Sequence, residues 1–406
     1  MDHVIAQLRE QVLDAAQQKH TILIEGGGTK NFYGNRALNS IDKAALNSRD
    51  KGALNTSDKA AQNSSDKVAL SRTDGDAPYL TSARVPLKLS ALRGIINYQP
   101  TELVVTAWAG TPLQEVIDTL AASKQILAFD PPAFGAQATL GGCVAAGLAG
   151  PGRYAGGPVK DYVLGTHLLI ASGSVLKFGG EVMKNVAGYD VSRLLVGSMG
   201  MFGALTQVSV KVAPMPQDVC TLEFALDEAS ALALCHSWRA QPLPISATAW
   251  QATEGASGCL RVRLAGAGAA LNTARQKMGG QVLPEVQAAE YWAALREQTL
   301  SFFATPTLWR LAVAPGTPAL NLGPTLIEWG GGQRWLAAEL DATTVRRVAE
   351  QAGGHATLFR LQSGHSLPEH GVFHPLAAGV LDVVKRLKQE FDPQGLFNPG
   401  RLVHGL

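Results

Sequence analysis

Three glycine-rich segments hold the residues whose types and spacing could do chemistry in this sequence. They are the turn Gly26-Gly27-Gly28-Thr29-Lys30, the segment 141–157 and the segment 179–203. Consecutive glycines can point successive main-chain N–H groups into one concavity, and their lack of side chains lets an anion approach closely. The turn at 26–30 is therefore either an anion site or a plain turn. Taken together, the three segments predict loops that converge on one extended, phosphate-bearing ligand.

The familiar nucleotide motifs are missing. No GxGxxG joins a strand to a helix inside a βαβ unit, and no GxxxxGK[ST] occurs. The folds that these two motifs mark are therefore disfavoured.

Polar side chains add a few further candidates. Lys184 and Asn185 stand side by side in GGEVMKNVAGYD and either contact a cofactor or cap a helix. Arg310, alone in the apolar segment TLWRLAV, either clamps a substrate carboxylate or lies on a solvated strand face. Four histidines lie near one another in sequence, but the Gly and Pro between them indicate surface loops more than a metal site. They are His355, His365, His370 and His374.

The composition is that of a globular protein rich in turns, with 46% apolar residues and 43 glycines. A chain of 406 residues exceeds what one hydrophobic core usually serves, so two domains are expected. The 35 basic and 33 acidic residues are too evenly balanced for nucleic acid or an anionic membrane as the main partner. The four cysteines form no CxxC pair, which argues against an iron–sulfur cluster or a structural zinc and fits a reducing cytoplasm.

No secretion signal opens the chain, and no run of about 18 apolar residues occurs that could cross a membrane. We therefore expect a cytoplasmic protein that is held at a membrane at most by a partner.

The elements that must position the glycine segments follow from the apolar pattern. Residues 4–20 have apolar positions at helical spacing, and TILIE (21–25) is a compact strand that runs into the Gly26 turn. Over 87–125 we expect one βα unit after another. The second helix is predicted to open with Thr111 as its cap and Pro112 in its first turn.

Strands and helices continue to the end of the chain. THLLIAS and SVLKFGG predict a pair of strands around Gly173, and 192–214 predicts a helix, a glycine-spaced turn and a strand that ends at Pro214. From about residue 217 longer helices alternate with amphipathic strands, which predicts an α+β domain. A last helix over 376–392 leads into PQGLFNPGRL.

An eight-residue unit, ALNSxDKA in its clearest copies, repeats from residue 37. At about 100° per residue its single leucine turns to a new side of a helix in each copy, so the repeat cannot form one buried stripe. The segment is either a docking arm for a partner or a tolerated surface insertion, because a long loop adds little closure entropy. We expect poor order between about 38 and 78.

These motifs, in this order, resemble the FAD-binding domains of the vanillyl-alcohol oxidase type, also called the PCMH type. The resemblance is carried by GGGTK, PPAFGAQATLGGCVAAGLAGPGRYAGGPVKDYVLG, FGGEVMKNVAGYDVSRLLVGSMGMFGALTQVSVKV and FDPQGLFNPGRL. Within that type, the chain is most similar to the FAD-binding E subunits of bacterial glycolate oxidases, over nearly its whole length outside the repeat.

The resemblance implies a fold. The class is α+β, with a two-subdomain PCMH-type FAD-binding domain over 1–216 and a smaller α+β cap domain over 217–375. A C-terminal helix and tail over 376–406 would pack back on the FAD-binding domain.

The resemblance also implies that the matching residues of this chain bind FAD. The turn Gly26, Gly27, Gly28, Thr29 and Lys30 would wrap the pyrophosphate. The ribityl and isoalloxazine side would be lined by Pro132, Thr139, Gly141 and Gly142. The loop that approaches the flavin would contain Arg153, Gly156, Val159 and Asp161. The adenine-side and second loops would contribute Gly188, Tyr189, Gly200 and Gly203, and the tail would contribute Asn398, Pro399 and Arg401. Lys184 and Asn185 are added as candidate contacts.

The departures from the family pattern imply that FAD is bound noncovalently. Family members that attach flavin often carry a histidine just after the glycine turn, where this chain has Thr29 and Lys30. Cys143 could offer a thiol link, but its place in a predicted helix favours a small buried residue.

The implied activity is FAD-dependent oxidation of glycolate to glyoxylate, with electrons passed through an iron–sulfur subunit to the quinone pool. A second flavoprotein subunit is the other implied partner. The second domain lacks a His- and acid-rich motif of the kind that related catalytic subunits use for a 2-hydroxy acid, and only Arg310 is a catalytic candidate. Two alternatives stay open: a self-sufficient dehydrogenase for a 2-hydroxy acid such as D-lactate, and a non-catalytic electron-relay subunit.

Overall fold

The computed structural model describes residues 1–35, 83–181, 189–253, 257–362 and 364–406. The octapeptide repeat, with its predicted poor order at 38–78, lies outside the described residues.

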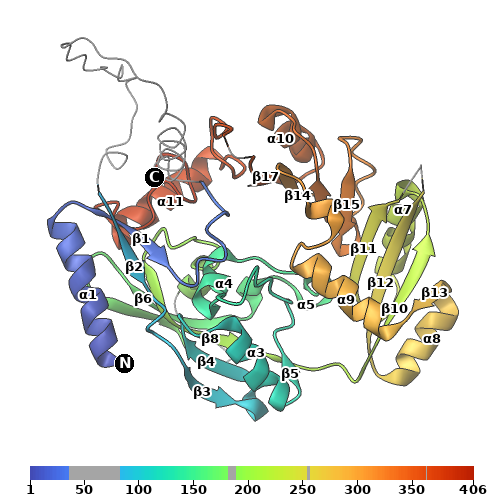
Figure 1. Ribbon diagram of the computed structural model, residues 1–406, viewed down its shortest axis with the longest axis horizontal. Helices are drawn as coiled ribbons and strands as arrows, with labels where there is room; N and C mark the ends of the chain where they lie inside the picture. Colours follow the sequence, from blue (N-terminus) through green and yellow to red (C-terminus); the bar gives the residue numbers. More distant parts are fainter. Residues whose placement is uncertain (36–82, 182–188, 254–256, 363) are drawn as a thin grey trace, which may run out of the picture.

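The chain begins with a helix that packs on a short parallel strand pair (Figure 1). Helix α1 (Asp2–Gln17) buries Leu8, Val12 and Ala15, which recur at helical spacing as the sequence predicted. Strands β1 (Thr21–Glu25) and β2 (Arg84–Lys88) run side by side, and β1 has the bounds predicted for TILIE. This pair leads the chain directly into the Gly26 turn.

A five-stranded antiparallel sheet forms the centre of the first half. Its strands, in spatial order, are β3 (Ile95–Gln99), β4 (Val104–Trp108), β8 (Ala204–Lys211), β6 (Val163–Leu169) and β7 (Val175–Gly179). Helices α3 (Leu113–Ala122) and α4 (Leu140–Ala146) pack on it, and a buried cluster that includes Val105, Val116 and Val208 joins helices and sheet. The remaining short elements are η2 (Pro100–Glu102), β5 (Gln125–Ile126), α5 (Arg153–Gly156), η3 (Val159–Asp161), α6 (Val191–Leu194) and β9 (Ala213–Pro214).

A second, eight-stranded antiparallel sheet stands beside the first (Figure 1). Its spatial order is β13 (Gln281–Leu283), β10 (Asp218–Ala225), β12 (Gly258–Gly266), β11 (Ile245–Ala252), β15 (Thr325–Glu328), β16 (Gln333–Leu336), β14 (Leu308–Ala312) and β17 (His355–Arg360). Its helices are α7 (Glu228–Arg239), α8 (Gly268–Met278), α9 (Glu285–Arg296), η4 (Ser301–Phe303), η5 (Trp329–Gly331) and α10 (Ala342–Gln351). Short α5 of the first half packs against β11.

The C-terminal segment returns to the start of the chain. Helix α11 (Ala378–Phe391), red in Figure 1, packs Val384, Leu387 and Phe391 on the core of the five-stranded sheet. The tail then pairs with β1 through a parallel bridge between Ile22 and Phe397. The α+β fold with a returning tail is thus the predicted one, while the exact division at 1–216, 217–375 and 376–406 stays a prediction.

Two local expectations were wrong. The segment 95–99 is strand β3, antiparallel to β4, so only β4 and α3 form the expected strand–helix order. Thr111 does not cap α3, because Pro112 is the N-cap residue. The Thr111 hydroxyl instead accepts a hydrogen bond from the Gly94 N–H and lies 2.7 Å from the Trp108 carbonyl oxygen. The Thr111 hydroxyl is thus occupied by main-chain groups of Gly94 and Trp108 and is not used to cap the helix.

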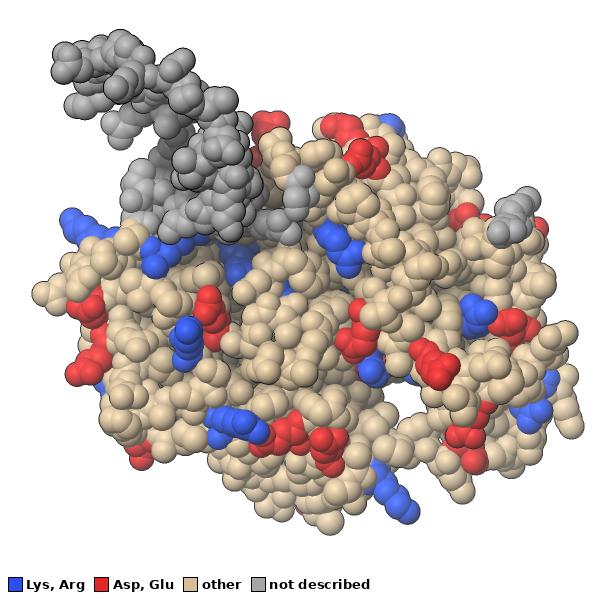
Figure 2. Space-filling view, viewed as in Figure 1, with Lys and Arg blue, Asp and Glu red and all other residues tan. Residues whose placement is uncertain are grey.

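Charged side chains of both signs are interspersed over the face in Figure 2, as the near-zero net charge led us to expect. In the described part of the chain, no helix is long and apolar enough to span a membrane.

Candidate functional site

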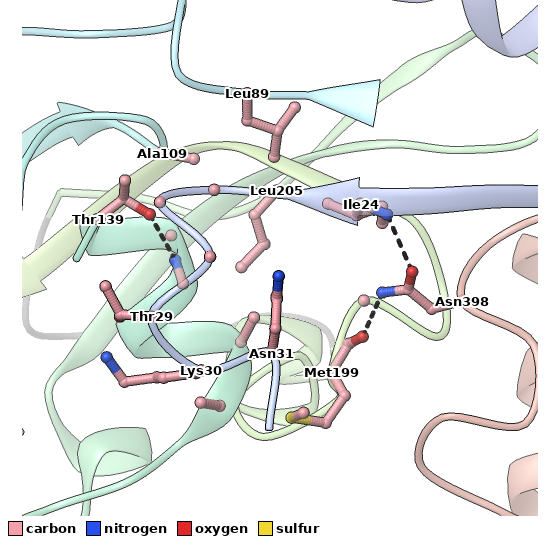
Figure 3. A pocket seen from close by; sticks show the side chains of 18 of the residues that line it. Ile24, Thr29, Lys30, Asn31, Leu89, Ala109, Thr139, Met199, Leu205 and Asn398 are labelled. Atoms are coloured by element: carbon pink, nitrogen blue, oxygen red, sulfur yellow. Dashed lines mark hydrogen bonds between the residues drawn. The ribbon is translucent and has the colours of Figure 1, made fainter. Parts of the chain in front are cut away.

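A cleft of about 720 Å³ lies between the end of β1, α4, the turn before β8 and the C-terminal tail (Figure 3). The predicted residues that line it are Gly26, Gly27, Gly28, Thr29, Lys30, Thr139, Gly141, Gly142, Gly200, Gly203, Asn398 and Arg401. The lining residues that sequence reasoning missed are Ile24, Asn31, Leu89, Ala109, Ala145, Ala146, Met199 and Leu205. Most of the missed residues are direct neighbours of the glycine segments, whereas nothing in the sequence marks Leu89 and Ala109.

The glycine turn after β1 forms one wall of the cleft with bare main chain. Within the described residues, the N–H groups of residues 26–30 donate no hydrogen bond. A Cβ atom on Gly27 would lie 1.3 Å from the Gln137 carbonyl oxygen, and one on Gly26 would lie 2.6 Å from the Thr139 hydroxyl. The turn thus packs so tightly on 137–139 that side chains are excluded, and its unused donors can take an anion's oxygens.

Helix α4 forms the opposite wall at the same close range. Thr139 caps the helix by accepting a hydrogen bond of 3.2 Å from the Gly142 N–H. A Cβ atom on Gly141 would meet the Ala109 side chain at 2.6 Å, so glycine is needed for α4 to approach β4. Cys143 on the same helix is 1% exposed, and burial raises the pKa of its thiol to about 11.

The C-terminal tail closes the cleft through Asn398. Its amide donates to the Met199 carbonyl at 2.6 Å and accepts from the Ile24 N–H at 2.9 Å (Figure 3). Both hydrogen-bonding groups of this side chain therefore hold β1 to the Gly200 turn. Arg401 also holds the tail in place, since its guanidinium lies within hydrogen-bonding distance of the carbonyl oxygens of Lys30 and Tyr33.

The two residues after the glycine turn point their side chains at a neighbouring loop. The Thr29 hydroxyl and the Lys30 ammonium donate to the Ala133 carbonyl at 2.8 and 3.1 Å. Lys30 is 9% exposed, and burial lowers the pKa of its ammonium. In return, the N–H groups of Ala133 and Phe134 donate to the carboxylate of Glu297, just after α9. This chain of contacts ties the glycine turn to the second half of the molecule.

The other predicted site residues that the structure describes do not line the cleft. They are Pro132, Arg153, Gly156, Val159, Asp161, Tyr189 and Pro399. Val159 belongs to the core of the five-stranded sheet, and Tyr189 is 97% exposed. Lys184, Asn185 and Gly188 lie outside the described residues. The roles assigned to all these residues stay predictions.

Arg310 lies in a polar cluster on the second sheet. Its Nε donates to the Gln333 side chain at 2.7 Å, and its guanidinium lies 5.5 Å from the Trp329 ring and 5.9 Å from the Trp335 ring. It is half-buried among these groups, so a freely solvated strand face does not describe it. The cluster includes a fourth glycine-rich segment, EWGGGQRW (328–335), which sequence reasoning passed over.

Two of the four histidines named from the sequence, His355 and His374, lie near each other. His374 contacts Glu350 at 3.1 Å, and its ring lies 6.4 Å from that of His355. Over the described ranges, no group of three or more His, Cys, Asp or Glu side chains could hold a metal ion.

Glu328 is a buried carboxyl group within the Arg310 cluster. Its Oε2 atom accepts from the Trp335 indole at 2.5 Å and from the Gln333 amide at 2.8 Å. Burial raises the pKa of Glu328 from 4.5 to about 7, against the opposing effect of these hydrogen bonds.

The raised pKa predicts a pH-dependent stability. Between about pH 4.5 and 7 the folded chain keeps a proton on Glu328 that the unfolded chain has released, so the free energy of unfolding falls as pH rises. The loss by pH 8 is at most about 3 kcal/mol. Glu328→Gln, whose amide oxygen can accept both hydrogen bonds, is expected to remove this loss when urea unfolding is compared at pH 5 and pH 8. Exposed Glu285→Gln should keep the wild-type slope, and an equal slope in Glu328→Gln would contradict the assignment.

Comparisons with known proteins show what this chain is similar to. Residues 71–179 match the family described as "FAD binding domain". The chain is 44% identical over 312 residues to the glycolate oxidase subunit GlcE of Escherichia coli K12, which covers 76% of this chain and 85% of that protein.

More distant similarities cover smaller regions or the fold alone. The chain is 31% identical over 138 residues to a D-lactate dehydrogenase of Anaerostipes hadrus, covering 34% of this chain and 29% of that protein. It is 30% identical over 142 residues to the glycolate oxidase subunit GlcD of Bacillus subtilis 168, covering 35% and 30%. A solved alkyldihydroxyacetonephosphate synthase shares the fold with a TM-score of 0.61 at 14% identity, over 97% of this chain and 74% of that one.

Proposed function

Because this chain belongs to the family of the glycolate oxidase subunit GlcE, we propose that it is the FAD-binding subunit of a glycolate oxidase. It takes part in the oxidation of glycolate to glyoxylate. The single observation that carries this proposal beyond the family is the row of unused N–H donors at residues 26–30, at the wall of a cleft lined by all three glycine-rich segments.

The residues of the cleft fit FAD. The N–H groups of the 26–30 turn would hold the pyrophosphate, which has no need of side-chain charges there. Ile24, Leu89 and Leu205 supply apolar walls on the same cleft. Some polar side chains of the cleft would support FAD binding only indirectly, by fixing the main chain, because their polar atoms already bond to protein groups. These are the side chains of Thr29, Lys30 and Asn398. FAD, when bound, supplies the two-electron acceptor for the CH–OH group.

We propose that the flavin is bound without a covalent link. The buried Cys143 thiol, whose pKa burial raises, is a poor nucleophile, and Thr29 and Lys30 follow the glycine turn. Denaturing the purified chain should therefore release all its FAD into the supernatant.

The partners that we propose are a second flavoprotein subunit and an iron–sulfur subunit that passes electrons to the quinone pool. The regional similarity to GlcD supports the first, because it indicates that two related flavoproteins serve the same kind of enzyme. Contact with the inner membrane would then be made through these subunits.

One experiment tests the proposal against its alternative. The purified chain should show a flavin spectrum, and the assembled complex should be reduced anaerobically by glycolate. Reduction of the isolated chain by D-lactate and not by glycolate would favour a self-sufficient D-lactate dehydrogenase, which the similarity to such an enzyme supports as the second candidate. If flavin in the complete complex stays oxidised with glycolate, the proposed function is wrong.

A further inference from the structure

Two arginines from different halves of the molecule meet on one indole ring. The guanidinium carbon of Arg153, in α5, lies 4.4 Å from the centre of the Trp329 ring, and that of Arg310, in β14, lies 5.5 Å from it. Burial lowers the pKa of Arg153, and the positive charge of Arg310 lowers it further. Two like charges at one ring are unfavourable unless an anion joins them.

Neither arginine has an acidic partner within 4.0 Å among the residues that the structure describes. Asp161 raises the pKa of Arg153 only from a greater distance. By contrast, the arginines of the nearby ion network are paired: Arg263 and Arg296 both bond to Asp130. Arg153 and Arg310 thus differ from these two arginines in having no carboxylate partner.

Arg310 is held in one orientation by a relay of buried side chains. Gln333 accepts from Arg310 Nε at 2.7 Å and donates to Glu328 at 2.8 Å, and Trp335 donates to the same carboxyl oxygen. Gln333 uses only the Nε edge of the guanidinium. The Tyr33 phenol hydrogen-bonds to the same guanidinium, and burial raises the pKa of Tyr33 while Arg310 opposes that effect. With five N–H donors, the guanidinium keeps further donors for a ligand.

The indole ring that both arginines contact belongs to a strained turn. Trp329, Gly330 and Gly331 have φ of 54°, 62° and 97°, all in the left-handed region. For a bulky tryptophan such a conformation is unfavourable. The turn is fixed by the Trp329 indole, which donates to the Gly150 carbonyl at 3.2 Å, and by the Gly330 N–H, which donates to Thr248 at 2.7 Å. Strain that is kept by specific bonds across two halves of a molecule is typical of a functional site.

The arginine pair adjoins the cofactor cleft. Tyr33 follows the glycine turn by three residues, and its carbonyl lies 3.3 Å from the guanidinium of Arg401, a residue that lines the cleft. An anion held by Arg153 and Arg310 would thus lie next to the ligand of the cleft. Two planar guanidinium groups match the two oxygens of a carboxylate.

We propose that Arg153 and Arg310, positioned on Trp329, bind the carboxylate of a small 2-hydroxy acid in this chain. The inference rests on the proposed function and deepens it, because it gives this subunit its own substrate-binding site. Gln333 and Glu328 are positioning residues for Arg310.

The test uses the full chain with FAD bound, titrated anaerobically with glycolate in a calorimeter. Arg153→Met and Arg310→Met keep the apolar stem and remove the charge, and each is expected to raise the Kd for glycolate at least tenfold. Arg310→Lys keeps the charge but loses the planar fork, so its Kd should lie between wild type and Arg310→Met. Exposed Arg93, paired with Glu115, gives the matched control Arg93→Met, which should bind as wild type does.

Ligand controls separate a carboxylate site from general attraction of anions. Neutral glycolamide should not bind. If sulfate binds as tightly as glycolate, if the arginine variants bind glycolate unchanged, or if Arg153→Met loses FAD, the two-arginine carboxylate site is overturned.

The ratio of flavin to protein distinguishes this inference from the proposed function. A chain that holds FAD but takes up no glycolate overturns the carboxylate site and leaves the proposed function standing. A chain that binds glycolate but never holds FAD keeps the site and overturns the function.

Discussion

Gly27→Ala is expected to lose FAD and to destabilise the fold. The new Cβ atom would lie 1.3 Å from the Gln137 carbonyl oxygen and 2.3 Å from its carbon, both of them main-chain atoms that cannot rotate away. The turn at 26–30 must therefore move, and its row of N–H donors moves with it. Loss of one or two hydrogen bonds to a charged phosphate group costs about 3 kcal/mol, which corresponds to about 100-fold in affinity. Overpacking adds a loss of about 1–3 kcal/mol in the free energy of unfolding.

The measurements are the flavin content of the purified variant, its Kd for added FAD, and its urea unfolding. Gly379→Ala is the matched control, because it makes the same change in the first turn of α11, where a new Cβ atom meets nothing within 4 Å. This control should bind FAD normally and be slightly stabilised, by up to about 1 kcal/mol. If Gly27→Ala retained FAD with wild-type affinity, the turn would not be the phosphate site.

Asp392→Ala is expected to release the C-terminal tail. Asp392 is fully buried, bonds to the Lys388 ammonium at 2.6 Å, and accepts from the N–H groups of Leu396 and Phe397 at 2.8 Å each. Burial lowers the pKa of Lys388, and Asp392 opposes that effect. Removing the carboxylate leaves a buried charge and two buried donors without their partner, at a cost of about 3–5 kcal/mol.

Flavin binding should weaken in the same variant. Phe397 and Asn398 would no longer be held on β1, and the cleft would lose its closing wall. The free energy of unfolding and the Kd for FAD are the two quantities to measure. Asp382→Ala, on the exposed side of the same helix, should change stability by less than about 0.5 kcal/mol. If the two aspartate variants had the same free energy of unfolding and the same Kd for FAD, the buried pair would not hold the tail.

Much of the lining of the cleft could be predicted because glycines supply a large part of it. Glycines have a distinct signature in sequence, and the turn at 26–30, the start of α4 and the Gly200 turn all line one cleft. The tail was predicted for a similar reason, since NPGR is a rare combination at a chain's end. The sequence could not show which atoms the side chains of these residues bond to. Asn398 and Lys30 were expected to contact the cofactor, and in the structure their polar atoms bond to protein groups.

The second half was predicted less well because its candidate site depends on side chains brought together across strands. Arg310, Gln333 and Glu328 come from three strands whose pairing order, β15-β16-β14, does not follow the chain. Arg153 comes from a short helix, α5, in the first half of the chain. No spacing in the sequence indicates that these side chains lie close together. The failed Thr111 cap has the same cause, because a partner distant in sequence, Gly94, replaced the local one.

The pairing of residues 396–398 with β1 has a consequence for biogenesis. Strand β1 and its glycine turn emerge early from the ribosome. Phe397, which bridges to β1, and the Asn398 amide, which bonds to Ile24 and Met199, come much later, with Asn398 translated 374 positions after Ile24. A nascent chain can form the five-stranded sheet and still lack a complete flavin cradle. Cofactor loading should therefore be a post-translational step, and stalled or C-terminally trimmed chains should accumulate as colourless protein.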